Sequence, residues 1–101
     1  MKDINVIIKH PHEPFVRATI PNTLASLQEV VGGFVETVTF ATDAVLICNE
    51  EGLISDLPYN CTMFGHQLFG TIAILGVNGD EFCDLSEAGI ALITGEVNAD
   101  D

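Results

Sequence analysis

Five consecutive apolar residues, Ala44–Cys48, lead directly into the polar turn Asn49–Gly52. A short apolar run of this kind, bounded by a turn, is typical of a strand that is buried on both faces of a sheet. We predict that this strand lies at the centre of the sheet. A second apolar run, Gly70–Val77, ends at the turn Asn78–Asp80 and predicts an adjacent central strand.

Shorter segments before the central strand also have the pattern of strands. Ile4–Ile8 and Phe15–Ile20 flank a turn with two prolines, which interrupt backbone pairing, so we predict that they form a hairpin. Phe34–Phe40 is rich in β-branched residues and predicts a further strand. The stretch between the two apolar runs has no such pattern. We expect an ordered connection over residues 53–60 and irregular structure over residues 61–68.

Two segments have the spacing of amphipathic helices. In the first, Asn22 is the better N-cap candidate, apolar residues follow at helical spacing, and a pair of glycines beginning at Gly32 ends the helix. In the second, Ser86 is the N-cap, apolar residues again follow at helical spacing, and Gly95 ends the helix. We expect the acidic residues 96–101 to form a frayed tail.

The order of these elements is strand, strand, helix, strand, strand, strand, helix. Strands outnumber helices without regular β-α alternation, which predicts an α+β fold with a mostly antiparallel, mixed sheet of about five strands and two helices. At 101 residues the chain supports one domain. We assign residues 1–95 to that domain and residues 96–101 to the tail.

The chain is both hydrophobic and acidic. Hydrophobic residues make up 48% of it, and fifteen Asp and Glu residues against three Lys and Arg residues give a formal net charge of -12. So much apolar content in a small chain indicates either a large core or an apolar face buried against a second copy. An exposed apolar patch would favour aggregation, so we predict a homodimer. The shortage of positive charge argues against direct binding to nucleic acid. It favours a basic partner protein, including one that itself binds nucleic acid.

No segment has the pattern of a membrane span or of a signal peptide. The apolar runs are far shorter than the roughly 20 residues that a span requires, and no uninterrupted apolar segment follows the N-terminal lysine. Cys48, Cys61 and Cys83 are odd in number and widely spaced, which argues against a disulfide framework. We therefore expect a cytoplasmic protein that does not bind a membrane.

The residue types that most often catalyse reactions or bind metals are dispersed. His10, His12, His66 and the three cysteines lack the Cys-x-x-Cys, His-x-x-x-His and Glu-x-x-His spacings, so we predict no metal site and no cofactor. Cys61 and His66 are the nearest thiol and imidazole, but a buried, inert thiol explains Cys61 better. Asn78–Glu81 lacks the remainder of a calcium-binding EF-hand loop. We assign no catalytic residue, and the pattern favours a non-catalytic protein over an enzyme.

Polar residues beyond the predicted central strand form the main candidate binding set. They are Asn49, Glu50, Glu51 and Asn60. They follow a rigid strand and a proline-fixed segment, from which side chains can be aimed at a ligand. The alternative is local turn chemistry, in which the same side chains satisfy nearby backbone groups. Asp56 joins Glu50 and Glu51 as a possible acidic cluster for a basic partner.

Glu36 is the charged member of the strand face that it shares with Phe34, Val38 and Phe40. Glu is seldom fully buried, so either the twist of the strand lifts Glu36 to the rim of the sheet or its carboxylate has a function. We include Glu36 among the candidate binding residues.

Several strings of the sequence are similar to one protein family. They are Pro21–Leu24, Leu27–Glu36, Cys48–Gly52, Leu57–Asn60 and Gly70–Ile72. They resemble the family known as domain of unknown function 3846, and the resemblance extends over about residues 3–93. That family consists of small proteins of phages, plasmids and bacterial genomes, so the resemblance implies a mobile-element context. It implies no mechanism, because the family has no assigned activity or catalytic residue.

Two functions follow from these features. The first is a non-catalytic, acidic binding protein of a mobile element that occupies a basic or nucleic-acid-binding partner protein. The second is a protein or enzyme that binds a small polar ligand at the polar end of the sheet, around Asn49–Gly52 and Asn60. A deep pocket flanked by Glu36, Glu50 or Asn60 would favour the second function. A purely structural subunit is the third alternative.

Overall fold

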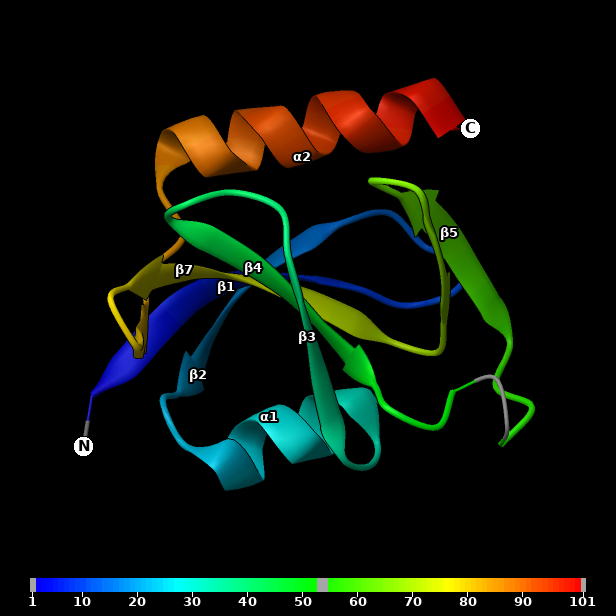
Figure 1. Cartoon of the computed structure of the whole chain (residues 1–101), viewed down its shortest axis with the longest axis horizontal. Helices are drawn as coiled ribbons and strands as arrows, with labels where there is room; N and C mark the ends of the chain where they lie inside the picture. Colours follow the sequence, from blue (N-terminus) through cyan, green and yellow to red (C-terminus); the bar gives the residue numbers. More distant parts are fainter. Residues whose placement is uncertain (1, 53–54, 101) are drawn as a thin grey trace.

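The computed structural model describes residues 2–52 and 55–100, and its centre is an antiparallel sheet of six strands (Figure 1). Five strands lie side by side in the order β2 (Val16–Pro21), β1 (Asp3–Lys9), β7 (Ile72–Asn78), β4 (Ala44–Asn49) and β3 (Val35–Thr39). The sixth strand, β8 (Glu81–Cys83), pairs with β7. The five-strand path therefore ends in two edge strands, β2 and β3.

The two apolar runs form neighbouring strands, as predicted. Leu46 of β4 lies opposite Ile74 of β7 in the antiparallel register. The prediction that Ala44–Cys48 forms the centre of the sheet is wrong by one strand, because β7 occupies the middle position between β1 and β4. Both strands are buried on both faces. Hydrophobicity alone therefore does not distinguish the middle strand from its neighbour.

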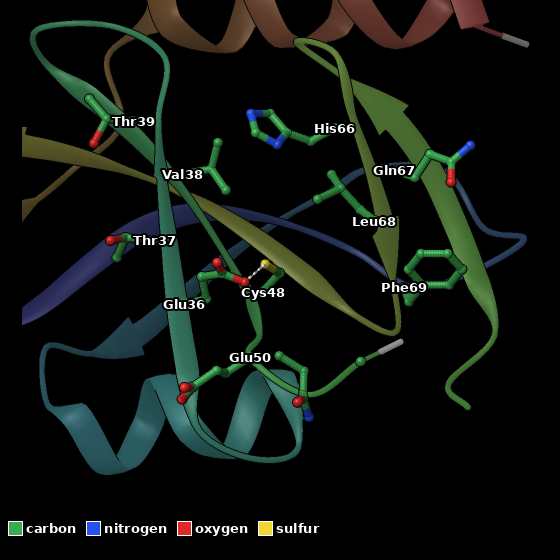
Figure 2. A pocket seen from close by; sticks show the side chains of 12 residues that line it. Glu36, Thr37, Val38, Thr39, Cys48, Glu50, His66, Gln67, Leu68 and Phe69 are labelled. Carbon is green, nitrogen blue, oxygen red and sulfur yellow. Dashed lines mark hydrogen bonds between the residues drawn. The ribbon is translucent and has the colours of Figure 1, made fainter. Parts of the chain in front are cut away.

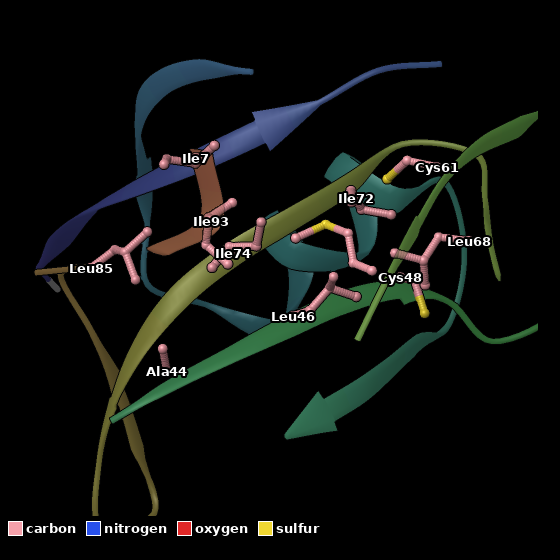
Figure 3. Close-up of a cluster of buried hydrophobic side chains, with 11 residues drawn as sticks. Ile7, Ala44, Leu46, Cys48, Cys61, Leu68, Ile72, Ile74, Leu85 and Ile93 are labelled. Atoms are coloured by element: carbon pink, nitrogen blue, oxygen red, sulfur yellow. The ribbon is translucent and has the colours of Figure 1, made fainter. Parts of the chain in front are cut away.

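Both faces of the sheet are covered, so the core lies in two layers. Helix α1 (Leu24–Val31) packs on one face. Helix α2 (Glu87–Asp100) and a hairpin of β5 (Tyr59–Met63) and β6 (His66–Phe69) cover the other face (Figures 1 and 3). The buried residues of the α1 layer are Ile4, Val6, Leu27, Val31, Val45, Ile47, Ala73 and Leu75. Those of the α2 layer are Ile7, Ala44, Leu46, Cys48, Cys61, Met63, Leu68, Ile72, Ile74, Leu85 and Ile93.

The first half of the chain folds largely as its pattern predicts. Strands β1 and β2 form the expected antiparallel hairpin. The N-cap of α1 is Thr23 and not Asn22, because the Thr23 side chain accepts a hydrogen bond from the Ser26 amide at 3.1 Å. The Asn22 side chain instead donates to the Phe82 carbonyl at 2.9 Å. Gly32 ends the helix with a φ of 77°, as expected.

The segment expected to be irregular contains the second hairpin. Strands β5 and β6 form a separate two-stranded sheet, and residues 59 and 60 of the expected connection belong to β5. Its turn has positive φ at both central residues, 51° at Phe64 and 80° at Gly65, as in a type I′ hairpin turn. Phe is an unusual residue at such a position, which is why the turn is hard to predict from sequence. Residues 53 and 54 lie outside the described residues.

Helix α2 is longer than its pattern predicts. Ser86 caps it, as expected, since its side chain accepts a hydrogen bond from the Gly89 amide at 3.0 Å. The helix does not end at Gly95 but continues to Asp100, so residues 96–100 are helical where a tail was expected. A glycine inside a helix costs only about 1 kcal/mol relative to alanine, which the rest of a helix can offset. Asp101 lies outside the described residues.

The observed class is α+β, as predicted, with mostly antiparallel strands and two helices. The additional strands are β5, β6 and β8. Within the described residues, no helix is long and apolar enough to cross a membrane.

Candidate functional site

A groove lies between the edge strand β3 and strand β6 of the hairpin (Figure 2). Its volume is about 470 Å³. It is lined by Glu36–Thr39 of β3, Cys48–Glu50 at the end of β4, Gly52, and His66–Phe69 of β6. We call it the β3–β6 groove.

Contacts at both ends hold the two walls of the groove together. At one end, the ring of Phe40, just after β3, stacks on Phe64 in the hairpin turn, with ring centroids 4.3 Å apart. At the other end, the turn after β4 passes close to β6, so that a Cβ at Gly52 would lie 3.1 Å from the Phe69 carbonyl oxygen. Gly52 therefore serves this close approach. Because these contacts join the two walls at both ends, the packing of the fold fixes the position of the groove.

Glu36, on the β3 wall, and Cys48, on the neighbouring strand β4, both line the groove. They are paired across β3 and β4, and the Cys48 thiol donates to Oε1 of Glu36 at 4.0 Å. Glu36 is exposed on the edge strand, in agreement with the expected position at the rim of the sheet. Burial, and to a lesser extent the negative charge of Glu36, raises the pKa of Cys48 to about 11. The thiol is therefore protonated at neutral pH and poorly suited to act as a nucleophile.

Asn49 and Glu50 follow at the end of β4, and both line the groove. The Asn49 side chain is engaged locally, since it donates to the Val31 carbonyl at 3.2 Å and accepts from the Glu51 amide at 2.8 Å. These bonds fix the turn against the end of α1, as the local-turn alternative describes. The Glu50 side chain is exposed, and its backbone amide donates to the Phe34 carbonyl at 2.8 Å. Glu50 thus adds a second carboxylate to the groove beside Glu36.

The other predicted site residues lie elsewhere. Glu51 is exposed and lines a separate hollow with Phe34 and Ser55. Asp56 is exposed in the following turn, with a φ of 59°. Asn60 is buried and away from the groove, and its amide bonds to Lys9 and to the Gly70 carbonyl. The structure therefore gathers Glu36, Asn49 and Glu50 in the groove and leaves Glu51, Asp56 and Asn60 outside it. Asn49 also lines the hollow that contains Glu51.

Sequence reasoning missed the β6 wall of the groove. His66, Gln67 and Phe69 were not among the predicted binding residues because their segment was expected to be irregular. A partial signal was present, since Cys61 and Met63 alternate with polar or small residues before Gly65, although the adjacent pairs Met63–Phe64 and Leu68–Phe69 obscure the pattern. Such alternation about a glycine is typical of a hairpin.

The groove is acidic. Two carboxylates, those of Glu36 and Glu50, line it, and none of the three Lys and Arg side chains of the chain does so in the described structure. Arg17 forms an ion pair with Glu87 at 3.3 Å, and Lys9 is buried against Asn60. His66 is the one basic side chain among the groove residues that the structure describes. A positively charged group entering the groove would meet uncompensated carboxylates.

Metal and thiol chemistry have no assembled site within the described residues. No group of three or more His, Cys, Asp or Glu side chains is placed to hold a metal ion there. No disulfide joins Cys48, Cys61 or Cys83. The groove therefore offers carboxylates, hydroxyls, two amides and an imidazole beside apolar side chains, and these groups are suited to recognition.

Comparison with known proteins places nearly the whole chain in one family. No match is found among curated proteins or among solved structures. A family model described as domain of unknown function (DUF3846) matches residues 1–98, in agreement with the resemblance of the sequence strings. Because this range covers nearly all of the 101 residues, the chain belongs to the DUF3846 family.

Proposed function

We propose that this protein is a non-catalytic binding protein that takes up a basic segment of a partner protein in the β3–β6 groove. The observation that carries the proposal is the pair of groove carboxylates, Glu36 and Glu50, with no Lys or Arg beside them among the described residues. A protein with a formal net charge of -12 attracts basic partners over long range, and the groove supplies a place for contact.

The chemistry of the groove favours binding over catalysis. The raised pKa of Cys48 keeps the thiol protonated, so the buried sulfur is a poor nucleophile. Asn49, one of the two amide side chains that line the groove, already bonds within the protein through both its nitrogen and its oxygen. The family resemblance adds a context, that of a phage or plasmid. A partner that normally binds nucleic acid would offer the basic segments that such a groove fits.

A small polar ligand in the same groove is the second candidate. The volume of about 470 Å³ lies within the range of small-molecule sites, which supports it. A ligand of this kind would have to be cationic, since Glu36 and Glu50 are the free charges available. The polyamine spermidine is therefore a suitable probe. A rise in melting temperature with micromolar spermidine, absent in a Glu36→Gln, Glu50→Gln variant, would favour this function over the first.

The proposal is tested by binding of a fluorescent peptide of sequence Thr-Lys-Val-Lys-Val-Lys-Thr, measured by anisotropy across a salt series. The variant Glu36→Gln, Glu50→Gln removes the groove charges. The matched control Glu13→Gln, Glu29→Gln removes the same net charge at exposed positions outside the groove. We expect the first variant to bind about tenfold more weakly at low salt, from two ion pairs of about 0.5–1 kcal/mol each, and the control to bind nearly as wild type. Equal losses of affinity in both variants would show that binding depends only on net charge, and would contradict binding in the groove.

A further inference from the structure

Resting on the proposed function, we infer that the basic segment binds as an added β-strand on the free edge of β3. Strand β3 is the last strand of the sheet path, and within the described residues only β4 pairs with it. In Figure 1, β3 runs across the front of the molecule. An edge strand with unpaired amides and carbonyls is a template for a strand from another chain.

The hydrogen-bond phase of β3 identifies which backbone groups are available. Antiparallel pairs alternate between hydrogen-bonded and non-hydrogen-bonded pairs. The Glu50 amide donates to the Phe34 carbonyl, so residues 34, 36 and 38 direct their backbone groups toward β4. The amides and carbonyls of Val35, Thr37 and Thr39 therefore point away from the sheet. These three residues provide a row of donors and acceptors on the open side.

The opposite edge of the sheet is less available. On β2 the same reasoning, from the Asn22 amide bonded to the Lys2 carbonyl, directs the backbone groups of Arg17, Thr19 and Pro21 outward. Pro21 has no amide hydrogen, and the Arg17 side chain is held by Glu87. Proline on an edge is a common protection against strand addition. Strand β3 carries no proline and no positive charge.

Charge selects a basic segment over a second copy of the chain. A strand added to β3 would direct alternate side chains toward the α2 face, beside Glu36 and at the mouth of the groove. Lys or Arg at these positions would meet the carboxylates of Glu36 and Glu50. The Phe34 ring, 64% exposed at the start of the edge, offers a further contact for a cation. A second copy would bring its own Glu36 and its own excess of acids to the same edge.

Backbone methylation of the peptide probe tests this mode of binding. Two versions of Thr-Lys-Val-Lys-Val-Lys-Thr carry N-methyl groups, one on both valines and the other on two lysines. In an added strand only one alternating set of amides faces β3, so one version should bind about tenfold more weakly and the other nearly as the parent peptide. Loss with the valines methylated indicates antiparallel addition and loss with the lysines methylated indicates parallel addition, and either supports the inference. Equal effects of the two sets would overturn it.

Matched proline variants test the edge from the protein side. Thr37→Pro removes an outward amide of β3 without removing a backbone bond to β4. Thr19→Pro likewise removes an outward amide of β2 without removing a backbone bond to β1, although it also removes the hydrogen bond that the Thr19 hydroxyl donates to Oδ1 of Asn5. We expect only Thr37→Pro to weaken binding, with circular dichroism confirming that both variants fold. If Thr37→Pro does not fold, the methylated peptides alone decide the question.

The outcomes also separate this inference from the proposed function. If binding depends on Glu36 and Glu50 but responds equally to both methylation sets, the proposed function stands and the inference of an added strand is wrong. Absence of peptide binding to the wild-type protein removes both. Self-association that Thr37→Pro abolishes, measured by sedimentation, would assign the edge to a second copy and contradict the inference.

Discussion

The ammonium group of Lys9 donates a hydrogen bond of 2.7 Å to Oδ1 of Asn60, and both side chains are buried. The amide nitrogen of Asn60 donates in return to the Lys9 carbonyl at 2.8 Å and to the Gly70 carbonyl at 2.7 Å. Lys9 ends β1, and Asn60 lies in β5 of the second hairpin. This pair therefore joins the second hairpin to the sheet. The other strand of that hairpin, β6, forms one wall of the groove.

The first prediction is that Asn60→Leu destabilises the fold by about 3 kcal/mol, because it leaves a buried ammonium group without its acceptor. Chemical denaturation of the variant measures the loss. The double variant Lys9→Met, Asn60→Leu should recover part of the stability, since it removes the buried charge as well. A double variant less stable than Asn60→Leu would show that Lys9 does not depend on Asn60.

The second prediction concerns the two apolar strands. Ile47 and Ile74 are both fully buried, in β4 and β7, but they belong to the α1 and α2 layers respectively. Replacing either by Ala should cost about 2–5 kcal/mol. Because they lie in different layers, the two losses should add to within about 0.5 kcal/mol if the sheet transmits little strain. Melting curves of both single variants and of the double variant test this, and a single loss below about 1 kcal/mol would contradict full burial.

The third prediction follows from the raised pKa of Cys48. The thiol ionises at an ordinary value of 9.0 when unfolded and at about 11 when folded. Burial of the neutral thiol therefore contributes to the free energy of unfolding in full below pH 9. This contribution, about 2–3 kcal/mol, is lost as the pH rises toward 11. Cys48→Ala should reduce the alkaline loss of stability by that amount. Cys83→Ala, at a half-buried position, is the matched control, and identical alkaline profiles for the two variants would refute the assignment.

The fourth prediction separates two neighbouring acids. Glu50 lines the groove, whereas Glu51 lines a different hollow. Glu50→Lys should therefore slow association with the basic peptide more than Glu51→Lys, although both change the net charge equally, because steering acts most strongly near the contact. Stopped-flow measurements over a salt series give the rates. Folding stability should change little in either variant, since both side chains are exposed.

The homodimer expected from the hydrophobic content stays a prediction. The exposed residues Leu24 and Leu92 belong to α1 and α2, which cover opposite faces of the sheet. One twofold interface can cover only one of these faces. Light scattering at high micromolar concentration and moderate salt measures the mass, and a monomer under those conditions would remove the prediction.

Local pattern determined most of the elements. The runs Ala44–Cys48 and Gly70–Val77 predicted two adjacent buried strands, and the early segments predicted a hairpin and α1, because periodicity and turn residues act over a few neighbouring positions. Local pattern failed where tertiary contacts outweigh it. The turn at Phe64 and Gly65 has positive φ at both residues, and Phe64 is held by stacking on Phe40, which is distant in sequence.

The sequence by itself determined the class of fold, the acidity of the chain and the identity of its few cations, since these depend on composition and periodicity. The tertiary structure decided which polar residues meet. Glu36 and Glu50 share a groove only because β3 pairs with β4 and the hairpin packs beside them. Asn60 does not line this groove, because its side chain is buried in a hydrogen bond with Lys9. Such meetings depend on strand order and on packing between distant segments, which no local spacing encodes.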